Sequence, residues 1–153
     1  MDWEPWIHFA HVTAAVVWVG GGVMLSLVAV RARRSEDLAV VREFARLLSY
    51  AGLRVFTPAV LVVLLSGLWL VLAGSEWNLT QLWILLALGA FAAAFLIGAV
   101  YLSRSAIHLE QVAATTPDLE AARAAIGRWL VGYGLVLAIL VFALWDMVFK
   151  PGT

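Results

Sequence analysis

The stretch that decides the fold is AHVTAAVVWVGGGVMLSLVAV, residues 10–30, because it is a long apolar run without a charged residue. A helix needs about 20 such residues to cross the roughly 30 Å of hydrocarbon in a bilayer. The segment must be helical there, since lipid offers no hydrogen-bond partners to an open backbone. The run therefore predicts a transmembrane helix over residues 6–30.

Three further runs of this kind follow, at residues 55–73, 82–102 and 129–149. Of the 153 residues, 64% are hydrophobic and only 13% are charged, which is too little polar surface to cover a soluble domain. We therefore predict an all-α integral membrane four-helix bundle that forms a single transmembrane domain over residues 1–153. The first run is not expected to be a cleaved signal peptide, because Asp2 and Glu4 precede it and its basic residues follow it.

The connections between spans predict helices that continue beyond the membrane. Residues 37–74 have apolar side chains at helical spacing and read as one long helix or a bent pair, with a kink or the start of the buried part at Pro58. Before the fourth span, Pro117 suits a first helical position and Thr116 an N-cap. We therefore expect extensions of helices 2 and 4.

The charges predict the orientation of the bundle. All nine arginines lie in the two connections between spans 1 and 2 and between spans 3 and 4: Arg31, Arg33, Arg34, Arg42, Arg46, Arg54, Arg104, Arg123 and Arg128. The positive-inside rule places these connections in the cytoplasm and both termini outside, as in a multi-pass protein of a bacterial-type inner membrane. The opposite end then has an aromatic belt of Trp3, Trp6, Trp77, Trp83 and Trp145, with Asp2, Glu4, Glu76 and Lys150.

Two histidines one turn apart, His8 and His11, begin the first span. Ionisable side chains inside a membrane are costly, which makes them candidates for function. Helical spacing puts them near one face with Trp18 and Gly22, and small residues beside an aromatic ring suit a planar macrocycle next to an axial histidine. The predicted cofactor-binding residues are His11, His8, Trp18, Gly21 and Gly22, with His11 or His8 as the metal ligand. Alternatively, His8 is hydrated among the headgroups and His11 is bonded to a neighbouring helix.

Asp146 and Lys150 lie four residues apart at the end of the fourth span, a favourable order for an ion pair. One interpretation is a pair that snorkels at the outer interface. The other makes them catalytic residues: Asp146 orients a histidine or accepts a proton, and Lys150 meets an anionic group such as a haem propionate.

Several features narrow the classes of function. The chain has no cysteine, which excludes disulfides, thiolate metal sites and iron–sulfur clusters, and zero net charge gives no indication of nucleic-acid binding. Ala90, Ala94 and Gly98 form a ridge of small residues suited to a close helix contact or to a homodimer interface. His108 lies in the inner connection, roughly 30 Å from the other histidines by helical rise.

The pattern of His11, Trp18, Gly20 and Gly21 resembles the first helix of two related bacterial families. These are the HemJ-type protoporphyrinogen oxidases and the CopD-like copper-resistance membrane proteins. LLSGLWLVL at residues 64–72 resembles the end of their second span, and VFKPG at residues 148–152 resembles the HemJ terminus. The resemblance implies haem b with His11 as axial ligand, a role in activity for Lys150, and oxidation of protoporphyrinogen. The third span and the segment before the last helix lack the polar residues of the HemJ family.

The leading hypothesis is thus a haem b membrane protein with a redox role, an oxidoreductase of a porphyrinogen or an electron carrier to quinone or another small hydrophobic substrate. A second hypothesis is copper or zinc handling by His8, His11 and an acid from Asp146 or Glu4. A third is a non-catalytic structural subunit. All three have the lipid bilayer as a partner.

Overall fold

The computed structural model describes residues 3–74, 78–115 and 118–152, and every regular element within these ranges is helical. Asp2, Glu76, Trp77, Thr116 and Pro117, which entered the predictions above, lie outside the described residues. Four continuous helices in the described part are long and apolar enough to cross a membrane. The predicted four-helix membrane bundle is therefore confirmed.

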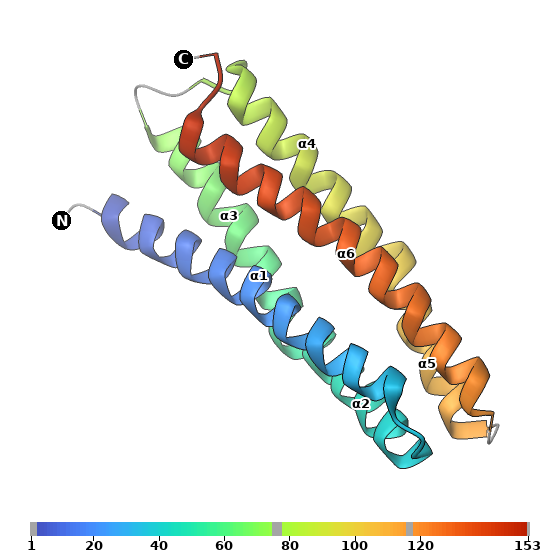
Figure 1. Cartoon of the computed structure of the whole chain (residues 1–153). Helices are drawn as coiled ribbons and strands as arrows, with labels where there is room; N and C mark the ends of the chain where they lie inside the picture. The colour runs from blue at the N-terminus through green and yellow to red at the C-terminus, as the bar shows by residue number, and fades with distance from the viewer. Residues whose placement is uncertain (1–2, 75–77, 116–117, 153) are drawn as a thin grey trace.

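The four helices are built from eight elements, of which two are π-helical. In chain order these are α1 (Glu4–Arg34); α2 (Leu38–Ala51), η1 (Gly52–Phe56) and α3 (Thr57–Ala73); α4 (Leu82–Leu96), η2 (Ile97–Leu102) and α5 (Ser103–Thr115); and α6 (Leu119–Phe149). Both chain ends lie at one end of the bundle, and α2 and α5 lie at the other, arginine-rich end (Figure 1).

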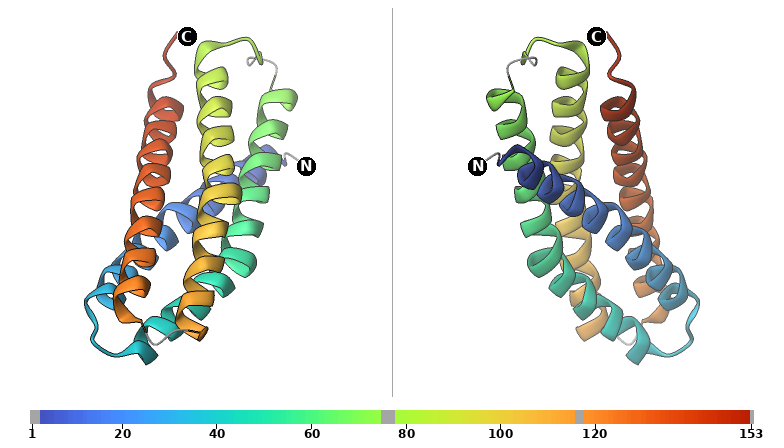
Figure 2. Two further views of the ribbon diagram at one scale, coloured as in Figure 1. Left: turned by 90° about the vertical axis from the view of Figure 1, so that its right-hand side faces the viewer. Right: turned by 90° about the vertical axis from the view of Figure 1, so that its left-hand side faces the viewer.

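The helices pack as a ring that is open on one side. Within the apolar part α1 packs against α3 and α6, and α6 packs against α4. At the arginine-rich end α2 packs against α5, and α5 against α6. In Figure 2, α1 runs obliquely across α3, α4 and α6, behind them in the left view and in front of them in the right view. In the described part α3 and α4 have no interface of comparable extent, so a groove is left between them.

The interior combines many alanines with a few large side chains such as Trp18 and Trp129, and most of the outer surface is covered by large apolar side chains. Ala29 and Ala94 are almost completely buried, whereas Val131 and Val148 are each 75% exposed. This reversal is stable only where the surroundings are apolar, as in lipid. From the predicted small-residue ridge, Ala90 and Ala94 are buried within the chain, so the ridge serves contacts inside the bundle.

Of the two alternatives for residues 37–74, one long helix or a bent pair, the structure has one continuous helix, Leu38–Ala73. The Asp37 side chain caps its start by accepting a hydrogen bond from the Ala39 amide at 2.8 Å, and the helix ends before Gly74. The predicted irregularity at Pro58 takes the form of the π-helical turn η1, in which the Thr57 amide bonds the carbonyl of Gly52. Proline has no N–H to offer, and the wider turn directly before it accommodates that loss.

The third helix is longer than predicted, because it continues through η2 and α5 to Thr115. Extensions were expected for helices 2 and 4 alone. The missed segment is amphipathic: Leu109 and Ala113 are buried against the bundle while Arg104 and Glu110 are exposed. Its apolar face is short and interrupted, and packing against α2 and α6 stabilises it more than its own propensity does.

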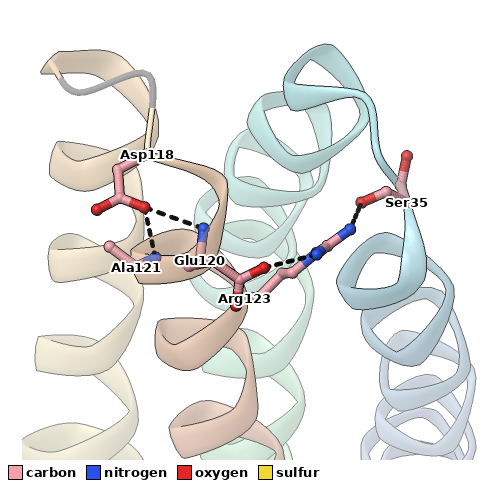
Figure 3. A network of polar contacts seen from close by, with 5 residues as sticks. All are labelled: Ser35, Asp118, Glu120, Ala121 and Arg123. Atoms are coloured by element: carbon pink, nitrogen blue, oxygen red, sulfur yellow. Dashed lines mark hydrogen bonds and ion pairs between the residues drawn. The ribbon is translucent and has the colours of Figure 1, made fainter.

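The start of α6 also differs from the prediction of Thr116 as N-cap. Asp118 is the cap, and its carboxylate accepts hydrogen bonds from the amides of Glu120 and Ala121, each at 3.0 Å (Figure 3). Arg123 then joins α6 to the turn between α1 and α2: it donates to the Ser35 carbonyl at 2.9 Å and to the Glu120 carboxylate at 2.7 Å. This contact fixes the arginine-rich ends of α1 and α6 together.

Candidate functional site

The two histidines of the first helix have different surroundings. His11 is buried, together with Trp18 and Gly22, on the face of α1 that meets the other helices. His8 is exposed on the outside of the bundle. Each helical residue advances about 100°, so His8 lies about 60° from His11 and about 80° from Trp18 around the helix axis. The prediction of one shared face therefore holds for His11, Trp18 and Gly22 and fails for His8.

His11 is held by a hydrogen bond to the second spanning helix. Its Nδ1 lies 3.0 Å from Oγ of Ser66 on α3, and this contact is buried. The same hydroxyl also bonds the backbone carbonyl of Val62, one turn earlier. A hydroxyl has one proton and a carbonyl can only accept, so Ser66 donates to Val62 and must accept from His11. We therefore assign the proton of the neutral imidazole to Nδ1, which leaves the lone pair on Nε2.

Gly67 lets the ring of His11 approach α3 closely. A Cβ atom at residue 67 would lie 2.9 Å from Cε1 and 3.4 Å from Nδ1 of His11. The Ser-Gly pair of α3 thus supplies both the hydrogen bond and the room for the imidazole. Both residues were missed as site residues from the sequence; the signal was a hydroxyl next to a glycine inside an otherwise apolar span.

His11 lines a small cavity of about 50 Å³ at the centre of the bundle. Trp18, Phe91 and Met147 contribute to the same cavity from α1, α4 and α6. The Trp18 and Phe91 rings meet edge to face, with centroids 6.0 Å apart. This space suits an ion or one or two waters, since ligand pockets usually measure about 300–1,000 Å³.

A larger apolar groove of about 580 Å³ lies between α3 and α4, further toward the arginine-rich end. Phe56 of η1 and Gly98 of η2 line its two sides, and Tyr133 of α6 lies at its back. Trp18 lines both the groove and the cavity beside His11, so its side chain lies between the two spaces. π-helical turns are frequent at functional sites, and the two such turns in the described residues, η1 and η2, both border the groove.

The glycines predicted to make room for a cofactor make room for side chains of the bundle. A Cβ at Gly22 would lie 1.9 Å from the Tyr133 hydroxyl, and one at Gly21 would lie 3.2 Å from the Phe56 ring. The Tyr133 hydroxyl donates to the Trp18 carbonyl at 3.4 Å. Gly20 has open space around it. A role of Gly21 and Gly22 in binding a cofactor stays a prediction.

Asp146 is completely buried near the end of α6, and neither of its carboxylate oxygens has a hydrogen-bond partner in the described part of the chain. The expected ion pair with Lys150 does not form. Lys150 adopts a left-handed backbone conformation (φ 44°), and its ammonium lies 5.4 Å from the centroid of the Trp83 ring. The helix has ended at that point, so the four-residue spacing no longer places the two side chains on one helical face.

No group of three or more His, Cys, Asp or Glu side chains close enough to hold a metal ion occurs among the described residues. The ion site predicted from His8, His11 and an acid stays a prediction. His108 belongs to α5, which lies at the opposite end of the bundle from the start of α1, where His11 is found (Figure 1). This separation is as expected from helical rise.

The similarity of this chain to a known protein family extends over nearly the whole spanning region. A family model described as a predicted integral membrane protein, DUF2269, matches residues 5–151. No curated protein and no solved structure matches the chain. Since the match covers nearly every residue of the four helices, the chain belongs to the DUF2269 family of predicted integral membrane proteins.

Proposed function

We propose that this integral membrane protein binds haem b through His11 and has a redox role inside the bilayer. The observation that carries the proposal is the buried contact between Nδ1 of His11 and Oγ of Ser66. Histidines that bind metals generally donate their second ring N–H to an oxygen acceptor, which fixes the tautomer and the ring orientation. Ser66 provides this acceptor, and Nε2 keeps the lone pair with which His11 would bind the iron.

The room beside His11 limits this proposal. The cavity of about 50 Å³ is too small for a porphyrin, and the groove of about 580 Å³ has the size but no histidine or methionine in its lining. A macrocycle at His11 therefore requires Trp18 to turn away from Phe91, which would join the two spaces. In the present arrangement Trp18 closes the space beside His11, so haem would bind only after this side chain has turned.

The groove adds a route for a hydrophobic reactant. Its lining is apolar and it lies where α3 and α4 do not pack together, so a quinone or porphyrinogen dissolved in the bilayer can enter from the side. Haem would supply one-electron redox chemistry when bound. His11 would hold the haem, Ser66 would orient the imidazole, and the apolar surroundings would exclude water.

The test is the visible spectrum of detergent-purified protein, oxidised and dithionite-reduced, for the wild type and for His11→Ala. His8→Ala is the matched control, because it removes an exposed histidine one turn away. We expect a Soret band with sharp reduced α and β bands in the wild type and in His8→Ala, and their loss in His11→Ala. Ser66→Ala should retain haem but broaden or shift these bands, since the imidazole loses its orienting partner. Equal haem bands in all four proteins would refute His11 as the ligand.

A single copper ion is the second candidate, favoured by one observation: His11 and Met147 line the same 50 Å³ cavity. Imidazole and thioether are ligands that Cu(I) accepts, and the space matches an ion. Metal analysis of haem-free wild type and Met147→Leu separates the candidates. Copper retained by the wild type and lost in Met147→Leu favours this function. A colourless protein without bound metal would point to a structural subunit.

A further inference from the structure

A basic hollow lies on the outside of the bundle at the arginine-rich end, where η2 continues into α5 and both meet α6. Its volume is about 400 Å³, and its polar lining consists of Tyr101, Arg104, Ser105, His108 and Arg128. It is separate from the groove and from His11, so what it binds does not depend on the function proposed above.

The basic side chains of the hollow come from two neighbouring helices, α5 and α6. Arg104 and His108 are four residues apart on one continuous helix and therefore share a face. Arg128 comes from the neighbouring helix α6. The Tyr101 hydroxyl donates to the Arg128 carbonyl at 3.3 Å, and its ring covers Gly132, where a Cβ would lie 2.4 Å from Cε1 of Tyr101.

The charge of the hollow is not neutralised from within the described part of the chain. Its lining contains no carboxylate. Elsewhere at this end, Arg46 and Arg123 form ion pairs with Glu43 and Glu120. In the described residues Arg104 and Arg128 form no such pair, and both are exposed. The hollow thus presents two permanent positive charges to an anion from outside the protein.

The depth of the hollow indicates which anion. Val100 belongs to its lining and to the last apolar turn of the third span, whereas Arg104 and His108 lie beyond that span. The site therefore crosses the boundary between hydrocarbon and water. A ligand that fills it needs an anionic group at the arginines and an apolar chain beside Val100. Basic pockets between spanning helices on the cytoplasmic side bind acidic lipid headgroups in this way.

We propose that this hollow binds the phosphate of an anionic phospholipid from the leaflet at the arginine-rich end, the cytoplasmic leaflet by the positive-inside rule. The guanidinium groups of Arg104 and Arg128 hold the phosphate, and Ser105 and His108 add hydrogen-bond donors. The acyl chains run along Val100 in the hydrocarbon.

The experiment measures lipid binding to the full chain in neutral detergent by native mass spectrometry. The probes are dioctanoyl phosphatidylglycerol and dioctanoyl phosphatidylcholine. We expect wild type to bind phosphatidylglycerol about tenfold more tightly, because each of two arginines contributes to the attraction. The double variant Arg104→Gln, Arg128→Gln should lose this preference. The control variant Arg31→Gln, Arg34→Gln removes two exposed charges at the same end, outside the hollow, and should keep it.

Three results would overturn the proposal: equal binding of both lipids by the wild type, an equal loss of preference in the control variant, or displacement of phosphatidylglycerol by millimolar inorganic phosphate. The last result would identify a site for free phosphate. If the double glutamine variant fails to fold, two further variants test the proposal. Arg104→Lys, Arg128→Lys should keep the preference, and Ser105→Asp, which adds a carboxylate to the hollow, should abolish it.

Discussion

Replacement of Gly22 by alanine should destabilise the bundle, because the Tyr133 side chain occupies the space of the new methyl group. The ideal Cβ would lie 1.9 Å from the Tyr133 hydroxyl and 2.4 Å from Cε1 and Cζ of its ring. The ring must therefore move, and it is packed against Trp129 at a centroid distance of 5.0 Å.

The magnitude follows from three terms. Overpacking a filled interior costs about 1–3 kcal/mol. Displacing Tyr133 also breaks its hydrogen bond to the Trp18 carbonyl, which contributes about 0.5–1.5 kcal/mol. Alanine gains about 1 kcal/mol over glycine in a helix interior. We therefore expect Gly22→Ala to lower the free energy of unfolding by about 0.5–3.5 kcal/mol.

The assay is unfolding of the detergent-solubilised protein by titration with SDS, followed by circular dichroism. Gly20→Ala is the matched control, because no atom lies within 4 Å of its ideal Cβ. It should be neutral or stabilised by up to about 1 kcal/mol. In a Tyr133→Leu background the two alanine variants should have nearly equal stability. If Gly22→Ala is as stable as Gly20→Ala in the wild-type background, Tyr133 does not fill the space next to Gly22.

Three further predictions concern single side chains. Gly67→Ala should push His11 away from Ser66 and lower the free energy of unfolding by about 1–3 kcal/mol in the same SDS assay. Gly89→Ala on α4 is the control, because its ideal Cβ has open space around it and should cause no such loss. Equal stabilities of the two variants would contradict the close approach of His11 to α3. Asp146→Asn should leave the stability unchanged or raise it by about 1–3 kcal/mol, since the buried carboxylate has no hydrogen-bond partner in the described residues. A clear loss of stability would contradict this and show that the carboxylate has a partner. Asp118→Ala should lower stability by about 0.5–2 kcal/mol, because it removes the N-cap of α6. Asp118→Asn should keep most of the wild-type stability, since asparagine also caps helices. An unchanged stability of Asp118→Ala would contradict the cap shown in Figure 3.

Most of the fold follows from the sequence because its determinants are local. Apolar runs of this length are helical in lipid, since the helix satisfies its own backbone. Asp37 and Gly74 mark where the second spanning helix begins and ends, and its π-helical turn lies directly before Thr57 and Pro58. The extension into α5 was missed because it depends on contacts with α2 and α6, which no local pattern encodes. For the same reason Asp118 was overlooked beside Thr116: either residue type caps a helix, and the choice between them is decided by how the chain enters α6.

The candidate site was predicted only in part, because its contacts join residues far apart in the sequence. Helical spacing placed His11, Trp18 and Gly22 on one face, which is correct. It could not reveal that Ser66 bonds His11 or that Tyr133 fills the space above Gly22, since these residues are 55 and 111 positions away. The sequence prediction also placed His8 on this face, although side chains three residues apart on a helix point about 60° away from each other around its axis.

The central claim is that Nε2 of His11 is a ligand for haem iron. The measurement that tests it most directly is the haem content per chain of protein produced with ample haem, in the wild type, His8→Ala and His11→Ala. We predict about one haem per chain in the first two proteins and almost none in His11→Ala. A wild-type protein without haem, or His11→Ala with undiminished haem, would contradict it.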